Sequence, residues 1–488
     1  MITPGYHRRV DNARLSALRS GASDRHRRAA PVTKQIFLGA FEEFTPNFIS
    51  NAWHHPRGDT SGFATLEYWQ DLARRLEDAG FDFLFLAEAL GYPMSGDDVP
   101  EVVIREAVQV PVHDPLALVS GLAATVDRLG FVVTASTTAQ QPYLNARTFT
   151  TLDHLTKGRI AWNIVTSDNQ VALTKLLGHD GVTPHDERYR RATEFVELCL
   201  KLWEGAWEDD AVVYDKATRT YADPAKVHRI THEGEYFRYD GYFPAIPSVQ
   251  RTPLLLQAGT SSAGRAFAGR YGECVFIQDR DLGKAAATVA DLRARAEANG
   301  RDPRHITVIP SVSIIVGDTE EEAVRLRAEL DATPSREAAA ALFMGWSGVD
   351  LMSFPLDATL AEVTTEVGQT MLAMFQQPEY SPTVAEILDV ITSSIGGMRV
   401  TGTAESVADQ LQEIVDRTDV DGFLIEYTYG SWETYRDFAE QVMPLLRERG
   451  MLPETPRSGS MRERILGRGV PTLPAGHPGS AFRVGEAR

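Results

Sequence analysis

Between residues 35 and 453, short apolar runs alternate with segments of helical periodicity, and this alternation constrains the fold more than any other feature. A strand followed by a helix, repeated along a chain, is typical of a parallel sheet covered by helices. The apolar runs lie at residues 36–41, 83–87, 131–135, 159–165, 254–257, 273–277, 306–316 and 422–425. Eight such strands predict a closed (β/α)8 barrel, the TIM barrel, with insertions.

The segments between these runs have the apolar spacing of helices. In residues 65–80, Trp69, Leu72 and Leu76 recur at helical intervals, and Gly80 is a typical helix stop. The other predicted helices span residues 114–129, 145–157, 186–204, a segment from 262, 283–298, 404–415 and 432–447.

Two segments interrupt the rhythm. Residues 205–250 are aromatic and rich in turn formers, and residues 333–397 carry Gly, Pro and Met without one clear period. Because loops after the carboxyl ends of barrel strands shape the active site, both segments are candidate lids or substrate walls. Aromatic residues such as Tyr236 and Tyr242 favour the first as an apolar wall, although such residues also pack a loop onto a barrel.

The two ends of the chain differ in composition from the middle. The first 34 residues contain eight Lys or Arg and two Asp, without the apolar region of a secretory signal. This composition favours a disordered basic tail, residues 1–34, over a partner-binding arm. Residues 454–488, rich in Gly, Pro and Arg, are expected to form a flexible tail.

Charge and cysteine content narrow the class of protein. A net charge of −18 argues against a general nucleic-acid binder, because affinity for phosphates comes from clustered Lys and Arg. No run approaches the roughly 18 apolar residues of a membrane span. The two cysteines, Cys199 and Cys274, provide neither a disulfide framework nor a zinc site, which fits a reducing cytoplasm. A small-molecule substrate is therefore expected.

Polar residues follow most of the predicted strands. They are Glu88, residues 136–138, residues 163–167, residues 259–262, Gln278, Asp279, Ser311, Ser313, Glu426 and Tyr427. One polar residue at a strand end carries little weight. The collective pattern predicts a site at the carboxyl rim of the barrel, where barrel enzymes place their chemistry.

The sharpest local signal is the sequence QAGTSSAGR at residues 257–265. A Gly-rich turn that leads from a buried strand into a helix directs backbone N–H groups and the helix dipole at an anion, which favours a phosphate. Arg265 and Ala266 stand where a P-loop has Lys and Ser or Thr, so a nucleotide hydrolase is disfavoured. The absence of GxGxxG after the first strand also disfavours a Rossmann site. An ordinary turn with a Ser cap explains the motif equally well.

Other motifs favour structural roles. Residues 185–189 begin a helix, where acidic residues suit the first turn and Tyr189 suits the core. His54 and His55 are adjacent, so their side chains point apart and no third ligand is spaced to join them; no metal site is expected. The usual hydrolase signatures are absent.

Seven short motifs follow one another along residues 35–453. They are FLAEALG at 85–91, TLDHLTKGR at 151–159, WNIVTS at 162–167, HDERY at 185–189, HEGEYF at 232–237, QAGTSS at 257–262 and AESVADQL at 404–411. In this order they resemble the bacterial luciferase-like flavin monooxygenases, in particular the nitrilotriacetate and dibenzothiophene-sulfone monooxygenase branch. Each motif is weak alone, and their shared order carries the resemblance.

The resemblance implies a luciferase-type barrel that receives FMNH2 from a separate NADH-dependent flavin reductase. Such enzymes use O2 to oxygenate a small organic substrate, often with cleavage of a C–N or C–S bond. A cytoplasmic homodimer or homotetramer is expected. The alternatives are an F420-dependent oxidoreductase on the same barrel and a non-catalytic flavin-binding protein, and the flavin that copurifies and the consumption of O2 would separate them.

The resemblance also assigns cofactor-binding residues by position. They are Ala87, Glu88, Ser136, Thr137, Tyr189, Ser261 and Ser262. Ala87 and Glu88 would flank the isoalloxazine, with Glu88 where the family usually has Asp. Tyr189 and the two serines match phosphate contacts, in agreement with the Gly-rich turn.

One departure concerns the oxygen chemistry. Some relatives have a histidine after the first strand, where this chain offers Asn47 and Ser50 as the candidate catalytic residues. Asn can donate a hydrogen bond but cannot titrate near neutral pH, so acid–base work would need another group. The candidate substitutes are His54, His55, His185 and Tyr427.

Overall fold

The computed structural model describes residues 34–46, 52–259, 261–365, 367–377, 380–393, 397–467, 469 and 471–485. Residues 1–33 of the predicted basic tail lie outside the described residues. The same holds for Asn47 and Ser50, the two candidate catalytic residues.

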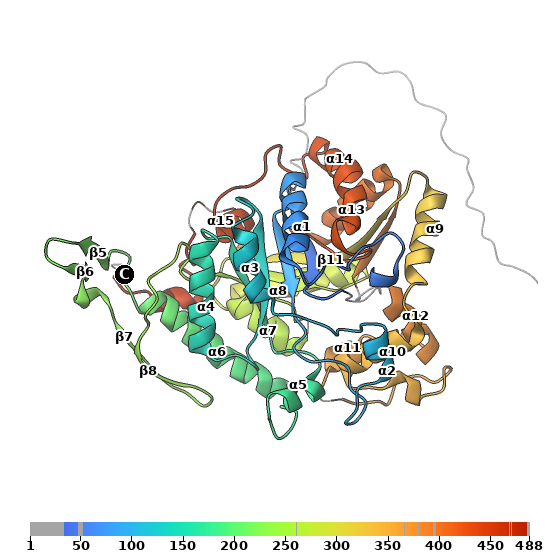
Figure 1. Cartoon of the computed structure of the whole chain (residues 1–488), viewed down its shortest axis with the longest axis horizontal. Helices are drawn as coiled ribbons and strands as arrows, with labels where there is room; N and C mark the ends of the chain where they lie inside the picture. The colour runs from blue at the N-terminus through green and yellow to red at the C-terminus, as the bar shows by residue number, and fades with distance from the viewer. Residues whose placement is uncertain are drawn as a thin grey trace, which may run out of the picture. The chain divides into compact units, whose positions relative to one another are not determined.

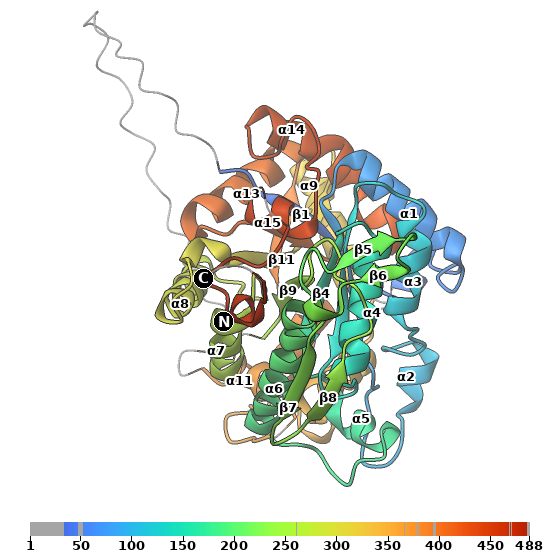
Figure 2. The same ribbon diagram turned by 90° about the vertical axis from the view of Figure 1, so that its left-hand side faces the viewer.

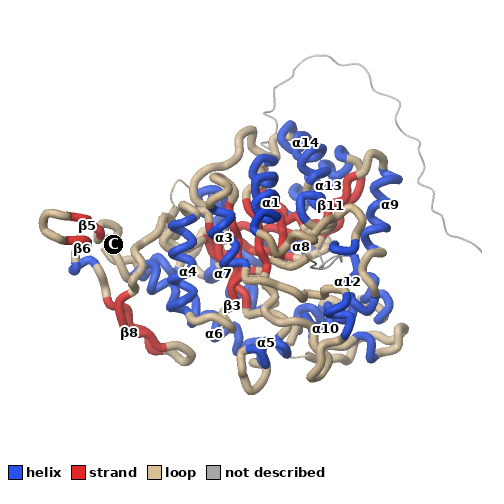
Figure 3. The backbone as a smooth tube through the Cα atoms, in the orientation of Figure 1, coloured by secondary structure: helices blue, strands red, loops and turns tan. Residues whose placement is uncertain are grey.

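Parallel strands form a closed barrel at the centre of the structure (Figure 3). Its strands are β1 (Phe37–Glu43), β2 (Phe83–Ala87), β3 (Gly130–Ser136), β4 (Ile160–Val165), β9 (Leu254–Gln257), β10 (Cys274–Ile277), β11 (Thr307–Val316) and β13 (Gly422–Ile425). They pair in this order, and β13 pairs back with β1. The predicted (β/α)8 barrel is therefore confirmed, with each strand close to its predicted position.

Helices surround the strands (Figures 1 and 2). They include α1 (Leu66–Ala79), α3 (Pro115–Ala123), α4 (Pro142–Leu155), α6 (His185–Gly205), α7 (Ser262–Tyr271), α8 (Leu282–Ala298), α13 (Ala404–Thr418) and α14 (Met443–Glu448), the last preceded by a π-helical turn (Phe438–Val442). The short helices α2 (Glu101–Arg105) and α5 (Gln170–Leu176) lie in connecting loops. In α1 the predicted stripe of Trp69, Leu72 and Leu76 is buried, and Gly80 ends the helix with a φ of 95°.

Large aromatic side chains fill the layer between strands and helices. Trp162 of β4 is fully buried, and its ring centroid lies 5.6 Å from that of Phe149 and 5.9 Å from that of Phe195. Inside the barrel, Phe41 and Phe85 stack with centroids 5.2 Å apart. Burial of such side chains stabilises the fold by about 1.5–3 kcal/mol each.

Strand β11 is longer than the other barrel strands, and this length positions the second insertion. Val312 pairs with both β13 and β12 (Met398–Gly402), and the residues after it, 313–316, pair with β12 rather than with a barrel strand. Helix α9 (Glu320–Asp331) packs on this extension, where Arg327 donates hydrogen bonds to the hydroxyl of Ser313 and the carbonyl of Val400. The chain therefore leaves α9 at the carboxyl rim of the barrel.

The second insertion begins there and forms a helical lid. Its helices are α10 (Arg336–Ser347), α11 (Gln369–Ala373) and α12 (Val384–Ser393). Phe343, Leu351, Leu360 and Ile387 belong to a hydrophobic core of the lid that is separate from the barrel core. We call the described part of residues 333–397 the lid.

The first insertion forms two antiparallel hairpins that extend away from the barrel (Figure 1). One pairs β5 (Val212–Asp215) with β6 (Thr220–Ala222), and the other pairs β7 (Arg229–Glu233) with β8 (Arg238–Tyr242). Both ends of the insertion meet at the amino ends of the strands, where the Thr252 hydroxyl donates to the Glu204 carboxylate at 2.6 Å.

The C-terminal segment differs from the flexible tail predicted for residues 454–488. Helix α15 (Met461–Leu466) closes the amino end of the barrel, with Met461 and Ile465 buried among aromatic side chains of the interior. Arg462 is fully buried and pairs with Glu273 at 2.7 Å. An arginine-rich composition suggested solvation, but the buried glutamate and nearby carbonyl groups satisfy this guanidinium.

Among the described residues, no helix combines the length and apolar character needed to cross a membrane.

Candidate active site

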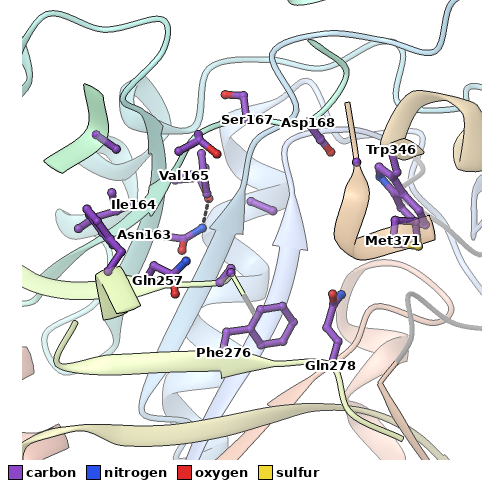
Figure 4. Close-up of a pocket in the computed structure, with 18 of the residues that line it drawn as sticks. Asn163, Ile164, Val165, Ser167, Asp168, Gln257, Phe276, Gln278, Trp346 and Met371 are labelled. Carbon is purple, nitrogen blue, oxygen red and sulfur yellow. Dashed lines mark hydrogen bonds between the residues drawn. The ribbon is translucent and has the colours of Figure 1, made fainter. Parts of the chain in front are cut away.

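A cavity of about 390 Å³ opens at the carboxyl ends of the strands (Figure 4). Side chains from β2, β4, β9, β10, α6 and the lid line it. Its volume and its mixture of apolar walls with a few polar groups are typical of a small-molecule site. The site predicted at the carboxyl rim therefore coincides with a cavity.

Three of the cofactor residues assigned by resemblance line this cavity: Ala87, Glu88 and Tyr189. Ala87 and Glu88 follow directly from buried β2, which ends at the rim. Tyr189 comes from the first turns of α6, whose amino end faces the same cavity. The structure thus brings together residues about 100 positions apart in the sequence.

The Gly-rich turn after β9 lies against Tyr189. A Cβ atom on Gly259 would lie 2.5 Å from the Tyr189 hydroxyl oxygen, and one on Gly264 would lie 2.9 Å from it. Ser261 caps α7, because its side chain accepts a hydrogen bond from the Gly264 N–H at 3.0 Å. The other first-turn N–H groups of α7, including that of Ser262, have no acceptor within the helix. This arrangement suits an anion at the rim.

Ser136 and Thr137 lie behind the cavity wall. Both are buried, and neither is among the described residues that line the cavity. The Ser136 hydroxyl lies 2.5 Å from that of Ser167, which does line the cavity, and Thr137 donates to the carbonyl of Val165. In the structure these two residues hold the end of β4 in place.

Two amides also line the cavity, Asn163 and Gln257, which belong to motifs singled out in the sequence without a role assigned to either side chain. The Asn163 Oδ1 and Gln257 Oε1 atoms are buried and have no hydrogen-bond partner among the described residues. The Asn163 Nδ2 donates to the Thr134 hydroxyl at 2.9 Å, which orients its oxygen. A buried unpartnered acceptor in a cavity indicates a ligand donor. Their position within buried strands was the signal available in the sequence.

Carboxyl groups also lie at or near the cavity, among them the lining residues Glu88 and Asp168. Burial raises the pKa of Glu88 to about 8 and that of Asp168 to about 6. Glu43, at the end of β1, is held by the backbone N–H of Ala89 at 2.9 Å, and burial followed by the charge of Asp168 raises its pKa to about 8. These groups can hold protons near neutral pH.

The lid supplies the apolar wall. Trp346, Val367, Met371 and Met374 line the cavity, and Figure 4 shows Trp346 and Met371 across it from Asn163 and Gln257. These lining residues agree with the hypothesis, made from the sequence, that this segment forms a wall. Composition alone did not indicate which of its side chains would face the cavity.

Two contacts fix the lid on the barrel. The Asn169 backbone N–H donates to the carbonyl of Gly345, the neighbour of Trp346, at 3.1 Å. Arg188 of α6 donates to the carbonyl of Val367 at 3.1 Å. Asn169 adopts a left-handed conformation with a φ of 46°, which Asn tolerates better than most residues. The wall is therefore attached to the barrel on both sides of Trp346.

The first insertion contributes nothing to this wall. None of the described residues 205–250 lines the cavity, so the expectation of a lid or substrate wall there is wrong. The physical reason is its attachment after α6, at the end of the barrel opposite the carboxyl rim. Phe237 and Phe243 are buried against the barrel helices, the packing role that aromatic residues in a loop also allow.

Of the four substitutes for the missing histidine, one lines the cavity. His185 lies at its edge, and its ring centroid is 5.2 Å from that of Tyr189. His54 is exposed, and the buried His55 packs on Tyr429. The Tyr427 hydroxyl donates to the carbonyl of Pro46.

This chain is similar to known proteins over most of its length. A family model described as luciferase-like monooxygenase matches residues 44–422. Long-chain alkane monooxygenase of Geobacillus thermodenitrificans is 39% identical over 93% of this chain and 99% of its own length. Dimethyl-sulfide monooxygenase of Hyphomicrobium sulfonivorans is 38% identical over 93% of this chain and 94% of its own.

A solved riboflavin lyase, with modified FMN and its substrate riboflavin, has a TM-score of 0.87 and 40% identity, covering 93% of this chain and all of that one. The expected branch is represented by dibenzothiophene-sulfone and nitrilotriacetate monooxygenases, at 34% and 30% identity. F420-dependent proteins of known structure share the fold at 13% and 14% identity, and at that level the likeness extends to the fold alone.

Proposed function

The chain belongs to the luciferase-like monooxygenase family and is an FMNH2-dependent monooxygenase, and we propose that the rim cavity binds reduced FMN and the substrate together. The observation that carries this proposal is the contact of Tyr189 with the Gly-rich turn before α7, at the edge of the cavity. F420-dependent hydride transfer on the same barrel is not favoured.

The phosphate of FMN would lie before α7. The first-turn N–H groups of this helix and its dipole attract an anion, and the hydroxyls of Tyr189, Ser261 and Ser262 can donate to it. Gly259 leaves the room in front of Tyr189 that a larger residue would fill.

The isoalloxazine would lie deeper in the cavity. Asn163 Oδ1 and Gln257 Oε1 are acceptors that no described residue reaches with a hydrogen bond, and a reduced isoalloxazine has ring N–H donors to offer them. Glu88 and Ala87 would border the ring from β2, as the resemblance implies. Ser136 and Thr137 would act indirectly, by holding Ser167 and the end of β4.

The bound cofactor supplies the electrons for activating O2, so that one oxygen atom enters the substrate and the other leaves as water. This chain's residues would exclude water, orient the substrate and hold protons. Trp346, Met371 and Met374 cover the cavity with apolar surface. Glu88, with its pKa raised to about 8 by burial, is largely protonated at neutral pH and can present a proton at its carboxyl oxygen.

The roles of Asn47 and Ser50 stay a prediction from their place after the first strand. His185 is the further candidate for acid–base work, because it lines the cavity beside Tyr189. Replacement of His185 by Gln would distinguish acid–base work by His185 from a role of Asn47 and Ser50. A changed pH profile of turnover would support His185 as the acid–base group. An unchanged profile would reject His185 and keep Asn47 and Ser50 as the candidates.

The substrate is a small organic molecule. By their names, relatives act on substrates as different as long-chain alkanes, dimethyl sulfide and nitrilotriacetate. Family membership therefore gives the reaction type and does not choose between oxygen insertion alone and oxygenation with C–S or C–N cleavage.

We infer a cytoplasmic enzyme that works with a separate flavin reductase and assembles as a homodimer or homotetramer. Val213, Tyr214 and Tyr221 are exposed on the β5–β6 hairpin, and a two-stranded ribbon is marginally stable alone. A second copy of this chain would cover these side chains. Sedimentation of the purified protein would test the state of assembly.

The deciding experiment supplies the purified protein with FMN, a flavin reductase, NADH and air. A panel of sulfides, sulfones, alkanes, aromatic amines and aminocarboxylates would be screened for oxygenated products. We expect product only with the complete system. Product that persists without FMNH2 would overturn the cofactor assignment.

The phosphate site has its own test. Replacing Ser261 and Ser262 together by Leu should weaken FMNH2 binding about 10–100-fold, because charge-assisted hydrogen bonds are lost. The matched control is Thr403→Leu, which removes a similar cap from α13, where the Thr403 side chain accepts from Ser406. Unchanged FMNH2 affinity in a folded double variant would mean that the phosphate binds elsewhere.

A further inference from the structure

The cavity has two chemically different halves. The amides Asn163 and Gln257 and the Tyr189 hydroxyl lie on the side proposed for the flavin. Trp346, Met371 and Met374 lie on the lid side, which is where a substrate would contact the protein (Figure 4). Apart from the exposed Gln369, the lid side chains that line the cavity are apolar.

The ionisable groups of the cavity are acidic or close to neutral. Among its described lining residues, Glu88, Asp168 and Asp279 carry carboxyl groups, His185 an imidazole, and none is Lys or Arg. A substrate carboxylate would therefore enter a low-dielectric space with other carboxyl groups and without a cationic partner.

The basic residues that flank the cavity are held by other groups. Arg188 donates to the backbone carbonyls of Thr183 and Val367, and Arg265 pairs with Asp291 at 2.7 Å. Arg280 follows the lining residue Asp279 in the sequence but does not line the cavity, and its charge interacts with Glu426 and Asp331. None of these guanidinium groups faces the lid side of the cavity as a lining residue.

We propose that this site selects uncharged, largely apolar substrates and rejects anionic ones. An anion buried without a cationic partner loses hydration that nothing replaces, whereas burial of apolar surface is favourable. Met371 and Met374 add flexible, polarisable surface that adapts to substrates of different shape. This inference rests on the proposed function, because it assigns the lid side to the substrate.

The test uses the FMN-loaded protein and two pairs of probes with similar shape. Dipropyl sulfide is compared with 3,3′-thiodipropionate, and 1-decanol with decanoate, by their perturbation of the flavin absorbance without O2. We expect each uncharged member to bind at least 100-fold more tightly than its anionic partner. Equal or tighter binding of the anions, or no binding by either uncharged probe, would overturn the proposal.

A charge added to the wall sharpens the result. Met371→Lys should raise the affinity for 3,3′-thiodipropionate at least tenfold and weaken that for dipropyl sulfide. The control is Met352→Lys, which adds the same charge to the lid at a residue that is 55% exposed and does not line the cavity. If both variants changed binding equally, the effect would be long-range and the wall assignment would be wrong.

The outcome is separable from failure of the proposed function. Failure of the protein to bind FMN, or to form any product with the reductase system, would reject the monooxygenase site itself. FMN binding and product formation together with a preference for the anionic probes would reject only the substrate class.

Discussion

The barrel has two long insertions, and only one of them lines the cavity. The first, residues 205–250, forms two exposed hairpins, and the second, residues 333–397, forms the lid that carries Trp346 and Met371 into the cavity. The first is the more aromatic in sequence, yet it contributes no described residue to the cavity. Both insertions were predicted as candidate walls, and only the second, less aromatic one lines the cavity.

The point of attachment explains the difference. The first insertion leaves from the end of α6 and re-enters at β9, so both ends lie at the amino end of the barrel. The second follows α9, which the β11 extension holds at the carboxyl rim. Parallel barrels place their active sites at the carboxyl rim. An insertion attached at that rim can therefore line the active site, whereas one attached at the amino end cannot.

The largest expected effect comes from the joint between lid and barrel. In Gly345→Ala the new Cβ atom would lie 2.2 Å from the Asn169 Oδ1, so either the lid or the buried Asn169 side chain, which is hydrogen-bonded to Gln109, must shift. We expect kcat/KM to fall about 100-fold, as a displacement of about 1 Å can cause. FMN affinity should change little, since the proposed phosphate site is formed by α6 and α7.

Two further variants sharpen this test. Gly241→Ala in the first insertion meets no atom closer than 4.0 Å and should leave kcat/KM unchanged. Asn169→Gly in the Gly345→Ala background removes the clashing side chain and tolerates the left-handed backbone, so part of the activity should return. Full activity in Gly345→Ala alone would show that lid docking does not position the wall.

A smaller loss is expected from the wall itself. Trp346→Ala removes aromatic surface from the cavity and should raise KM about 10-fold with a smaller change in kcat, the pattern of lost ground-state binding. Tyr221→Ala removes an aromatic side chain that is 52% exposed on the first insertion, and steady-state kinetics should not change. A similar loss in both variants would contradict the distinction between the insertions.

The barrel could be predicted because its signals are local. Each strand is a short apolar run, and helices such as α1 have a clear period and a Gly stop. The closure of the C-terminal segment could not be predicted, because Arg462 resembles a solvated residue until Glu273, 189 positions away, is brought beside it. Long-range pairing of this kind has no local pattern.

The candidate site was predictable in part for the same reason. Ala87, Glu88 and Tyr189 were assigned to the cofactor by the resemblance and line the cavity. Asn163 and Gln257 belonged to predicted motifs without an assigned role, because an amide within a buried strand gives no local sign of the side to which it points. Trp346 lies in a segment without one clear period, so its orientation depends on the Asn169–Gly345 contact rather than on local sequence.

The pH dependence of stability should have opposite signs at the cavity, which Glu88 lines, and in the first insertion. The folded-state pKa of Glu88 is raised from 4.5 to about 8, so the folded protein loses stability as the pH rises from about 4.5 through 8. Glu88→Gln removes this loss and should be about 1–2 kcal/mol more stable than the wild type above pH 8, after allowance for partial exposure. Chemical unfolding of the apoprotein at pH 4.5 and 8.5 would measure it.

The matched substitution in the first insertion is Asp240→Asn. Arg229 holds the pKa of the exposed Asp240 below its usual range, so this pair stabilises the folded state above about pH 4 and the contribution is lost as the pH falls. Asp240→Asn should therefore be neutral or slightly destabilising near pH 7 and indistinguishable from wild type in acid. If Glu88→Gln and Asp240→Asn both gained stability at high pH, the gain would not come from the burial of Glu88, because Asp240 is exposed.

The smallest effect on catalysis is expected at the tip of the first insertion. Val213→Thr with Tyr214→Ser exchanges apolar for polar side chains on β5, where both residues are exposed. Because the hairpin lies away from the cavity, kcat/KM should stay within about twofold of wild type, as for most surface changes. If a second copy covers this hairpin, sedimentation should instead report a smaller assembly. A large loss of turnover without a change in assembly would mean that the first insertion acts on the active site after all, through a route other than the cavity wall.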